Sequence, residues 1–127
     1  MSTDTLCISY HTDPNDTYAE SLEVRGASRT LFISGQIPTD ESGVVPAEFG
    51  QQCRNAWRRI LNLLEQNDME PRNLVKITTY LRDRADKDDS RRIRNEVLGD
   101  LRPSLTVIIV DLYEADWLVE IEAVAMA

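Results

Sequence analysis

Residues 105–126, LTVIIVDLYEADWLVEIEAVAM, decide the fold of this chain. In the second part, residues 118–126, apolar residues alternate with Glu120 and Glu122, and this period of two predicts a strand with one buried face. The first part, residues 105–112, is apolar on both faces, so it predicts a strand that is covered on both sides. The C-terminal end of the chain is therefore expected to supply two strands of a sheet.

Two helices are expected to pack on this sheet. Apolar residues recur every three or four positions across residues 49–64, which predicts an amphipathic helix that begins near Pro46 and ends near Asn67. Acidic residues precede arginines in residues 86–94, an order that the helix macrodipole favours. This order predicts a second helix that ends near Leu98.

The remaining β-prone segments lie before and between the helices. Residues 74–81, LVKITTYL, alternate between two faces and predict a strand. Residues 6–10, 21–24 and 30–34 predict an N-terminal antiparallel meander. With no repeat or linker, residues 1–127 are expected to form one domain.

One face of this sheet lacks cover within the chain, because two helices cannot cover both sides. Leu105, Val107 and Ile109 share one parity of their strand, and we expect them on the uncovered face beside Glu120. Burial against a second copy of the chain would stabilise such a face. The pattern therefore predicts a homo-oligomer.

The charge of the chain argues against nucleic-acid and membrane partners. The 127 residues carry 14 Lys and Arg against 22 Asp and Glu, a formal charge of −8. Nucleic acids and anionic membranes are bound mainly by basic surfaces, so neither is an expected partner. No apolar run approaches the roughly 20 residues of a membrane-spanning helix, and residues 1–16 lack a signal-peptide pattern. We expect a cytoplasmic protein.

The few cysteines and histidines restrict the chemistry further. Cys7 and Cys53 are far apart and belong to no CxxC pattern, so neither a disulfide framework nor a metal site is expected. His11 is the single histidine and lies in a polar segment, which argues against Ser-His-Asp and Cys-His catalysis and against RNA cleavage by a histidine pair.

Four motifs occur together in the chain: DTYAESL around Tyr18, LFISGQIP at 31–38, LVKITTYLRD at 74–83 and LVEIEAVA at 118–125. By these motifs the sequence resembles the Rid family, also called YjgF-like proteins. The resemblance implies an α+β, chorismate-mutase-like (YjgF-like) fold, with an antiparallel-rich mixed sheet and two helices on one face. It also implies a homotrimer with small-molecule clefts between subunits.

The resemblance also implies a reaction. Active Rid proteins hydrolyse imines and enamines to a 2-oxo acid and ammonia without a cofactor, so no cofactor is expected here. Glu120 matches the carboxylate that positions or activates water, and Tyr18 matches a tyrosine of the cleft; these are the expected catalytic residues. Gly35 matches a backbone position that contacts the substrate.

The sequence departs from the family where the substrate carboxylate is bound. Family members have an arginine in a Pro-Ala-Arg-Ser segment, where this chain has Pro103, Ser104, Leu105 and Thr106. A gapless correspondence puts Leu105 at the arginine position, and a slip of one residue puts Ser104 there. Val107 continues the same strand face, so Leu105 and Val107 are expected to give the substrate site an apolar floor.

Other arginines could replace the missing one. The resemblance places Arg91 at a cleft-lining position of the second helix, and Arg102 lies just before the altered motif. Arg91 also fits a solvated helix surface, and Tyr18 and Glu120 also fit a packed aromatic and an interface charge.

Three functions remain open from the sequence. The first is a homotrimer that binds or hydrolyses a small metabolite, such as a carboxylate or an imine, but is not an efficient 2-imino acid deaminase. The second is an imine or enamine deaminase that uses Arg91 or Arg102 as its cation. The third is a non-catalytic regulatory or structural trimer.

Overall fold

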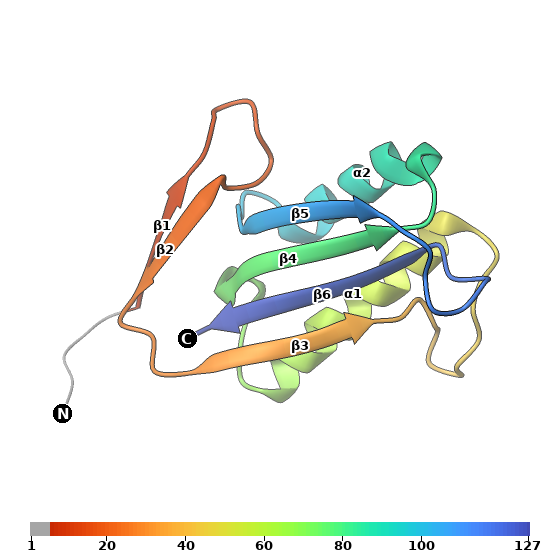
Figure 1. The fold of residues 1–127 in the computed structure, drawn as a ribbon. Helices are drawn as coiled ribbons and strands as arrows, with labels where there is room; N and C mark the ends of the chain where they lie inside the picture. Colours follow the sequence, from red (N-terminus) through yellow and green to blue (C-terminus); the bar gives the residue numbers. More distant parts are fainter. Residues whose placement is uncertain (1–5) are drawn as a thin grey trace.

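A mixed four-stranded sheet carries both helices on one face, and an N-terminal hairpin stands beside it (Figure 1). The computed structural model describes residues 6–127, so residues 1–5 of the segment searched for a signal peptide lie outside the described residues. In chain order the elements are β1 (Cys7–His11), β2 (Ser21–Arg25), β3 (Thr30–Gln36), α1 (Phe49–Gln66), β4 (Leu74–Leu81), α2 (Lys87–Leu98), β5 (Ser104–Ile109) and β6 (Val119–Met126), with short 3-10 turns at Pro71–Asn73 and Arg84–Asp86.

The sheet has the strand order β3-β6-β4-β5. β6 pairs antiparallel with both β3 and β4, whereas β4 and β5 are parallel and are connected through α2. This arrangement confirms the expected α+β class and the antiparallel-rich mixed sheet with two helices on one face. No helix of residues 6–127 is long and apolar enough to span a bilayer.

The first helix ends as predicted but begins later. α1 stops at Gln66, and the expected start near Pro46 is wrong because the helix begins at Phe49. Glu48 before it has an extended backbone, and the Gln52 side chain donates a hydrogen bond to the Pro46 carbonyl at 2.8 Å. This bond holds the approaching chain outside the helix axis and satisfies a carbonyl that no helical amide reaches.

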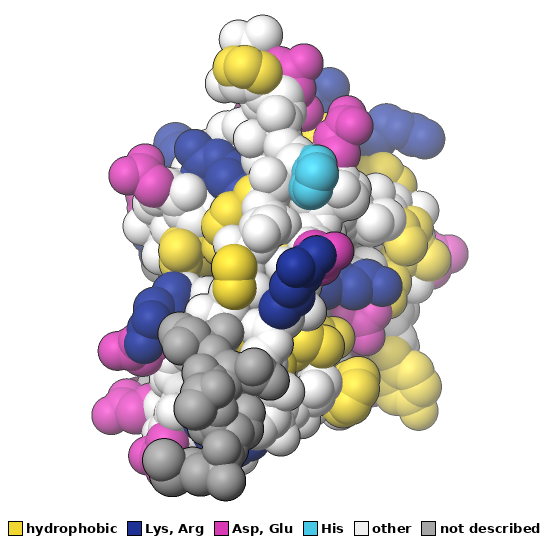
Figure 2. Space-filling model, turned by 90° about the vertical axis from the view of Figure 1, so that its left-hand side faces the viewer, with side chains coloured by type: hydrophobic (Ala, Val, Ile, Leu, Met, Phe, Trp, Pro, Cys, Tyr) yellow, Lys and Arg dark blue, Asp and Glu magenta, His cyan; other side chains and the backbone are white. Residues whose placement is uncertain are grey.

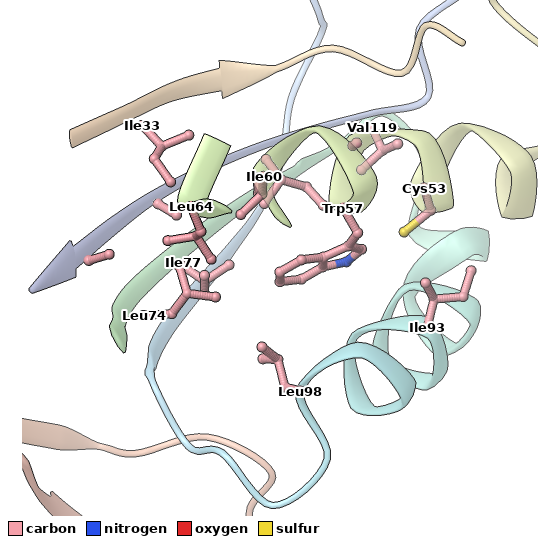
Figure 3. Packing of buried hydrophobic residues seen from close by; sticks show 14 of the residues in the cluster. Ile33, Cys53, Trp57, Ile60, Leu64, Leu74, Ile77, Ile93, Leu98 and Val119 are labelled. Atoms are coloured by element: carbon pink, nitrogen blue, oxygen red, sulfur yellow. The ribbon is translucent and has the colours of Figure 1, made fainter. Parts of the chain in front are cut away.

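The hydrophobic core lies between the helices and the sheet (Figure 3). Trp57 and Ile60 of α1 and Ile93 of α2 are almost completely buried, with exposures of 2%, 0% and 0%. On β6, Val119 and Ile121 are fully buried, which confirms that their parity faces the helices. Helical and strand periodicity thus point apolar side chains into one layer.

The expected N-terminal meander is only partly correct. β1 and β2 form an antiparallel hairpin, but β3 pairs with β6 rather than with β2. Gly26, at φ 76°, lets the chain turn away after β2, and the Ser28 and Arg29 amides then donate to the Ala127 carbonyl at 2.8 and 2.9 Å. These bonds direct β3 to the edge of β6.

The expected grouping of β5 residues with Glu120 is wrong. The parallel register pairs Leu105 with Ile77 and Val107 with Thr79, whose side chains are buried on the helix side of the sheet. Glu120 pairs instead with Tyr80 of the other parity. Neighbouring residues across a sheet share a face, so Leu105 and Val107 lie on the helix side and Glu120 on the opposite, open face. The alternation of residues within one strand does not show how that strand is aligned with its neighbour, so the sequence could not predict this register.

The loop between β1 and β2 reaches back to the main sheet. Its Ala19 amide donates to the Pro103 carbonyl at 3.1 Å, and Ala19 forms a parallel bridge with Ser104 at the start of β5. This bridge places the preceding residue, Tyr18, beside the exposed edge of the sheet. Figure 2 looks onto the hairpin end of the molecule, where His11, the cyan side chain, is exposed.

Candidate functional site

The residues singled out from the sequence form two groups on opposite faces of the sheet. Gly35 and Glu120 lie together on the open face, where a Cβ atom built on Gly35 would overlap the Glu120 carboxylate. Tyr18, Arg91 and Val107, together with Leu105, line a pocket on the helix side. One chain therefore brings the predicted residues together in two half-sites, which we call the open-face half-site and the helix-side pocket.

A β-bulge shapes the open-face half-site. The register between β3 and β6 shifts after Ile33, so that Gln36 pairs with Ile121 and the intervening Ser34–Gly35 segment carries one extra residue. A bulge leaves part of the backbone without a ladder partner, which frees polar backbone groups for a ligand. The Gln36 side chain donates to the Ser34 carbonyl at 2.9 Å and holds the bulge in shape.

Acidic groups dominate the open face near this bulge. Burial raises the pKa of the Glu120 carboxyl above its usual range, and the neighbouring Glu122 charge raises it further. The Tyr80 hydroxyl donates to Glu122 Oε1 at 2.6 Å, and this bond raises the pKa of Tyr80. Glu120 makes no such bond to Tyr80, so its carboxylate on this face is not engaged by the tyrosine hydroxyl, and its pKa is raised.

The helix-side pocket lies between α2, the β1–β2 loop and β5, and has a volume of about 400 Å³. Leu105, Val107 and Ile109 form one side of it. Arg91, expected as a substitute cation, stands at its wall with a half-exposed side chain, 3.7 Å from the Asp88 carboxylate. Remaining lining residues are Thr17, Tyr18, Arg84, Lys87, Ser90 and Arg94.

Arg94 is the most deeply buried cation among the pocket residues that the sequence did not single out, which also include Thr17, Arg84, Lys87 and Ser90. Its surface is only 6% exposed, and its Nη2 donates to the Thr17 hydroxyl at 3.1 Å. The sequence analysis gives Arg94 no role in a site, yet Ser90, Arg94 and Leu98 are spaced four residues apart and are all buried. That spacing places them on one helix face, and it is the signal that would have found Arg94.

The second substitute cation, Arg102, has a different position. Its Nη1 donates to the carbonyls of Gly99 and Leu101, both at 2.9 Å, at the C-terminal end of α2. Arg102 is not among the residues that line the helix-side pocket. In this conformation its guanidinium satisfies carbonyls of the turn that follows α2.

The described residues offer no metal-binding cluster. No group of three or more His, Cys, Asp or Glu side chains within residues 6–127 is placed to hold a metal ion. The side chains present are a carboxyl with a raised pKa on one face, and arginines with an apolar strand on the other. These are the components of proton transfer and of anion binding.

Comparisons with known proteins agree with this architecture. A family model described as Endoribonuclease L-PSP matches residues 9–127. A RutC family protein of Pyrococcus horikoshii is 31% identical over 114 residues, covering 88% of this chain and 88% of that protein.

Two solved structures share the fold. YyfB of Yersinia pestis, described as a protein of unknown function of the conserved Rid protein family, has a TM-score of 0.82 at 20% identity and covers 94% of this chain and 98% of its own. Escherichia coli TdcF, solved with bound serine, has a TM-score of 0.73 at 21% identity, with 93% and 91% covered.

Proposed function

The chain belongs to the endoribonuclease L-PSP family, which includes the Rid and RutC proteins, and from this premise we propose that it is a homotrimer that binds a small metabolite between its subunits. The metabolite is a carboxylate or an imine, and hydrolysis of ordinary 2-imino acids is inefficient. The bound serine in the TdcF structure is in keeping with a small ligand of this kind. A cytoplasmic location is part of the proposal.

The separation of the two half-sites carries the proposal. Gly35 and Glu120 lie on the open face, whereas Tyr18 and Arg91 line the helix-side pocket of the same chain. A sheet separates them, so a single subunit cannot present all four residues to one ligand. A second subunit can do so, because its open face can approach the pocket at the β5 edge of the first.

The open face also has the apolar character of an interface. Phe32 of β3 is 77% exposed and Ile108 of β5 is 39% exposed, although both are large and hydrophobic. A contact between two different surfaces, an open face and a pocket edge, is head-to-tail, and such contacts form a ring when the rotation between subunits closes. The family resemblance supplies the expected number of three subunits.

The expectation of weak deaminase activity rests on the pocket floor. Leu105 and Val107 place apolar side chains in the pocket. In the family that the chain resembles, this part of the site has an arginine that binds the substrate carboxylate. Losing a charge-assisted contact in the transition state costs about 3 kcal/mol, or roughly a hundredfold in rate. Glu120, with its raised pKa, remains available for proton transfer.

A deaminase that uses Arg91 is the second candidate function, since Arg91 lines the pocket. Coupling the protein to an amino-acid oxidase and following 2-oxo acid release separates the two candidates. We expect a rate at least a hundredfold below that of an efficient deaminase assayed in parallel. A comparable rate that Arg91→Ala abolishes would establish the second candidate. A protein with neither turnover nor ligand binding would be a structural or regulatory trimer.

The assembly itself is tested by light scattering. At micromolar concentration the particle should have three times the mass of one chain. A clean monomer would contradict the proposed function, because the two half-sites would then never meet.

A further inference from the structure

The helix-side pocket gathers four cationic side chains, of which Arg91 lies near the Asp88 carboxylate outside the pocket lining. Arg84, Lys87, Arg91 and Arg94 line it, and none of the described residues that line it is an Asp or Glu. This is unexpected in a chain with a formal charge of −8. A concave site that collects one sign of charge attracts ligands of the opposite sign.

Arg94 is the buried member of this cluster and carries the inference. It forms no ion pair within residues 6–127, and its Nε finds no acceptor there. Its hydrogen bond to the neutral Thr17 hydroxyl leaves most of its five N–H donors without a strong acceptor. Burial lowers the pKa of Arg94, and the nearby Arg91 charge lowers it further. A buried charge without an anion is costly, and a bound anion would remove that cost.

Arg58 provides a comparison within the same molecule. Its Nε also lacks an acceptor, but its Nη1 donates to Asn55 Oδ1 at 2.9 Å and its Nη2 to the Thr39 carbonyl at 3.4 Å. Arg58 therefore ties the chain after β3 to α1, and it does not line the helix-side pocket. Arg94 joins α2 to the β1–β2 loop through a single hydrogen bond to Thr17, so it has fewer acceptors than Arg58.

The opposite side of the pocket is apolar and therefore favours a hydrocarbon group of the ligand. Leu105, Val107 and Ile109 occupy alternate positions of β5 and face the cations across the cavity. Val107 and Ile109 remain 43% and 37% exposed, so they have apolar surface left to bury. A ligand with an anionic end and a hydrocarbon end would satisfy both sides of the pocket.

We propose that Arg94 binds the carboxylate of a small organic acid whose hydrocarbon side chain packs on Leu105, Val107 and Ile109. The planar fork of a guanidinium matches the two oxygens of a carboxylate. This inference rests on the proposed function and deepens it, because it assigns the anionic end of the ligand to a helix residue rather than to β5. Arg91, half-exposed and near Asp88, contributes less than Arg94.

Calorimetric titration with four probes tests the ligand class. The probe 3-methylbutanoate should bind at least tenfold more tightly than 3-methylbutanamide, which has the same shape without the charge. It should also bind at least tenfold more tightly than acetate, which lacks the hydrocarbon, and than inorganic phosphate. Equal binding of the amide, or tighter binding of acetate or phosphate, would overturn the assignment.

Substitutions on α2 test the residue. Arg94→Met should weaken 3-methylbutanoate binding at least tenfold while the midpoint of thermal unfolding stays unchanged or rises, because an uncompensated buried charge has been removed. Arg92→Met is the matched control, since Arg92 is exposed on the same helix and pairs with Asp89 and Glu96. Unchanged binding in Arg94→Met, or a larger loss in Arg91→Met, would contradict the inference.

Two further measurements keep the outcomes separate. If Arg94→Met does not fold, Arg94→Lys replaces it, because lysine keeps the charge but lacks the planar fork. Arg94→Lys should bind 3-methylbutanoate at least threefold more weakly than the unaltered protein. Equal binding by the two proteins would refute the role of Arg94. Light scattering on the same samples reports the assembly. A trimer that does not bind the acid overturns this inference alone, whereas a monomer that binds it through Arg94 overturns the proposed assembly alone.

Discussion

At the scale of single residues, the open-face half-site depends on the absence of a side chain at Gly35. The Glu120 carboxylate occupies the space that a Cβ atom of residue 35 would need. This close approach, next to the bulge of β3, holds Glu120 partly buried and keeps the pKa of its carboxyl raised. A glycine on β3 thus affects the pKa of a carboxyl on the adjacent strand, β6.

Gly35→Ala should displace the Glu120 carboxylate rather than the backbone, because the overlapping atoms are the end of a flexible side chain. We expect a stability loss of about 1 kcal/mol. In a carboxyl NMR titration, the pKa of Glu120 should fall toward its ordinary value as the group moves into solvent. Gly50→Ala is the control: its site is empty within 4 Å and lies in α1, so alanine should stabilise by roughly 0.5–1 kcal/mol and leave Glu120 unchanged. An unchanged Glu120 titration in Gly35→Ala would contradict this account.

The two cysteines should differ sharply in reactivity. Burial raises the pKa of the Cys53 thiol to about 12, whereas Cys7 is exposed in β1. At pH 8 a disulfide reagent should therefore label one thiol rapidly in the folded protein and two after denaturation. The mass of the labelled peptide should identify Cys7. Rapid labelling of Cys53 in the native state would show that the core around α1 opens readily.

At the scale of elements, one side chain anchors the loop between β5 and β6. Arg82, just after β4, donates to the carbonyls of Trp117 and Glu114, both at 2.7 Å, and to that of Leu112 at 3.5 Å. The amide of Arg82 also donates to the Leu118 carbonyl at 3.1 Å. The guanidinium thus satisfies carbonyls of a loop that has no helix or strand of its own. This loop leads into β6, the strand that carries Glu120.

Arg82→Ala should lower the free energy of unfolding by about 2 kcal/mol, since charge-assisted bonds to carbonyls are lost. Arg72→Ala is the matched control, because Arg72 is exposed and pairs only with its neighbour Glu70; its effect should stay within about 0.5 kcal/mol. Urea denaturation measures both changes. Equal effects of the two substitutions would mean that the loop needs no anchor.

At the scale of the whole molecule, the sheet has one covered face and one face that its own chain leaves open. The buried cluster lies on the helix side, while Phe32, Ser34, Lys76 and Thr78 border a hollow of about 300 Å³ on the open side. Phe32 is the large exposed apolar residue beside this hollow, and exposed apolar surface is a feature of protein–protein interfaces. The proposed assembly follows from this asymmetry.

Phe32→Asp should convert the oligomer to monomers, because a carboxylate buried in an apolar contact costs several kcal/mol. Tyr113→Asp is the control: Tyr113 is 90% exposed in the β5–β6 loop, so its substitution should leave the assembly intact. Sedimentation velocity at matched concentrations distinguishes the two. An unchanged oligomer in Phe32→Asp would place the interface elsewhere.

The sequence by itself determined the elements and most of their boundaries. Period-two and period-3.6 patterns gave the exact range of β4, the end of α1 and the buried parity of β6, because these patterns are local consequences of backbone geometry. The motifs around Tyr18 and Glu120 also identified the family, which the family model confirms.

Tertiary structure alone decided which residues meet. The parallel register of β4 and β5 moved Leu105 and Val107 to the face opposite Glu120, and a bridge far away in sequence brought Tyr18 to the edge of β5. Arg94 became the buried arginine of the helix-side pocket through the packing of α2, whereas Arg91 at the pocket wall and Arg92 outside the pocket are exposed. Register and helix orientation are set by contacts between distant segments, and a one-residue change of register exchanges the faces of a strand.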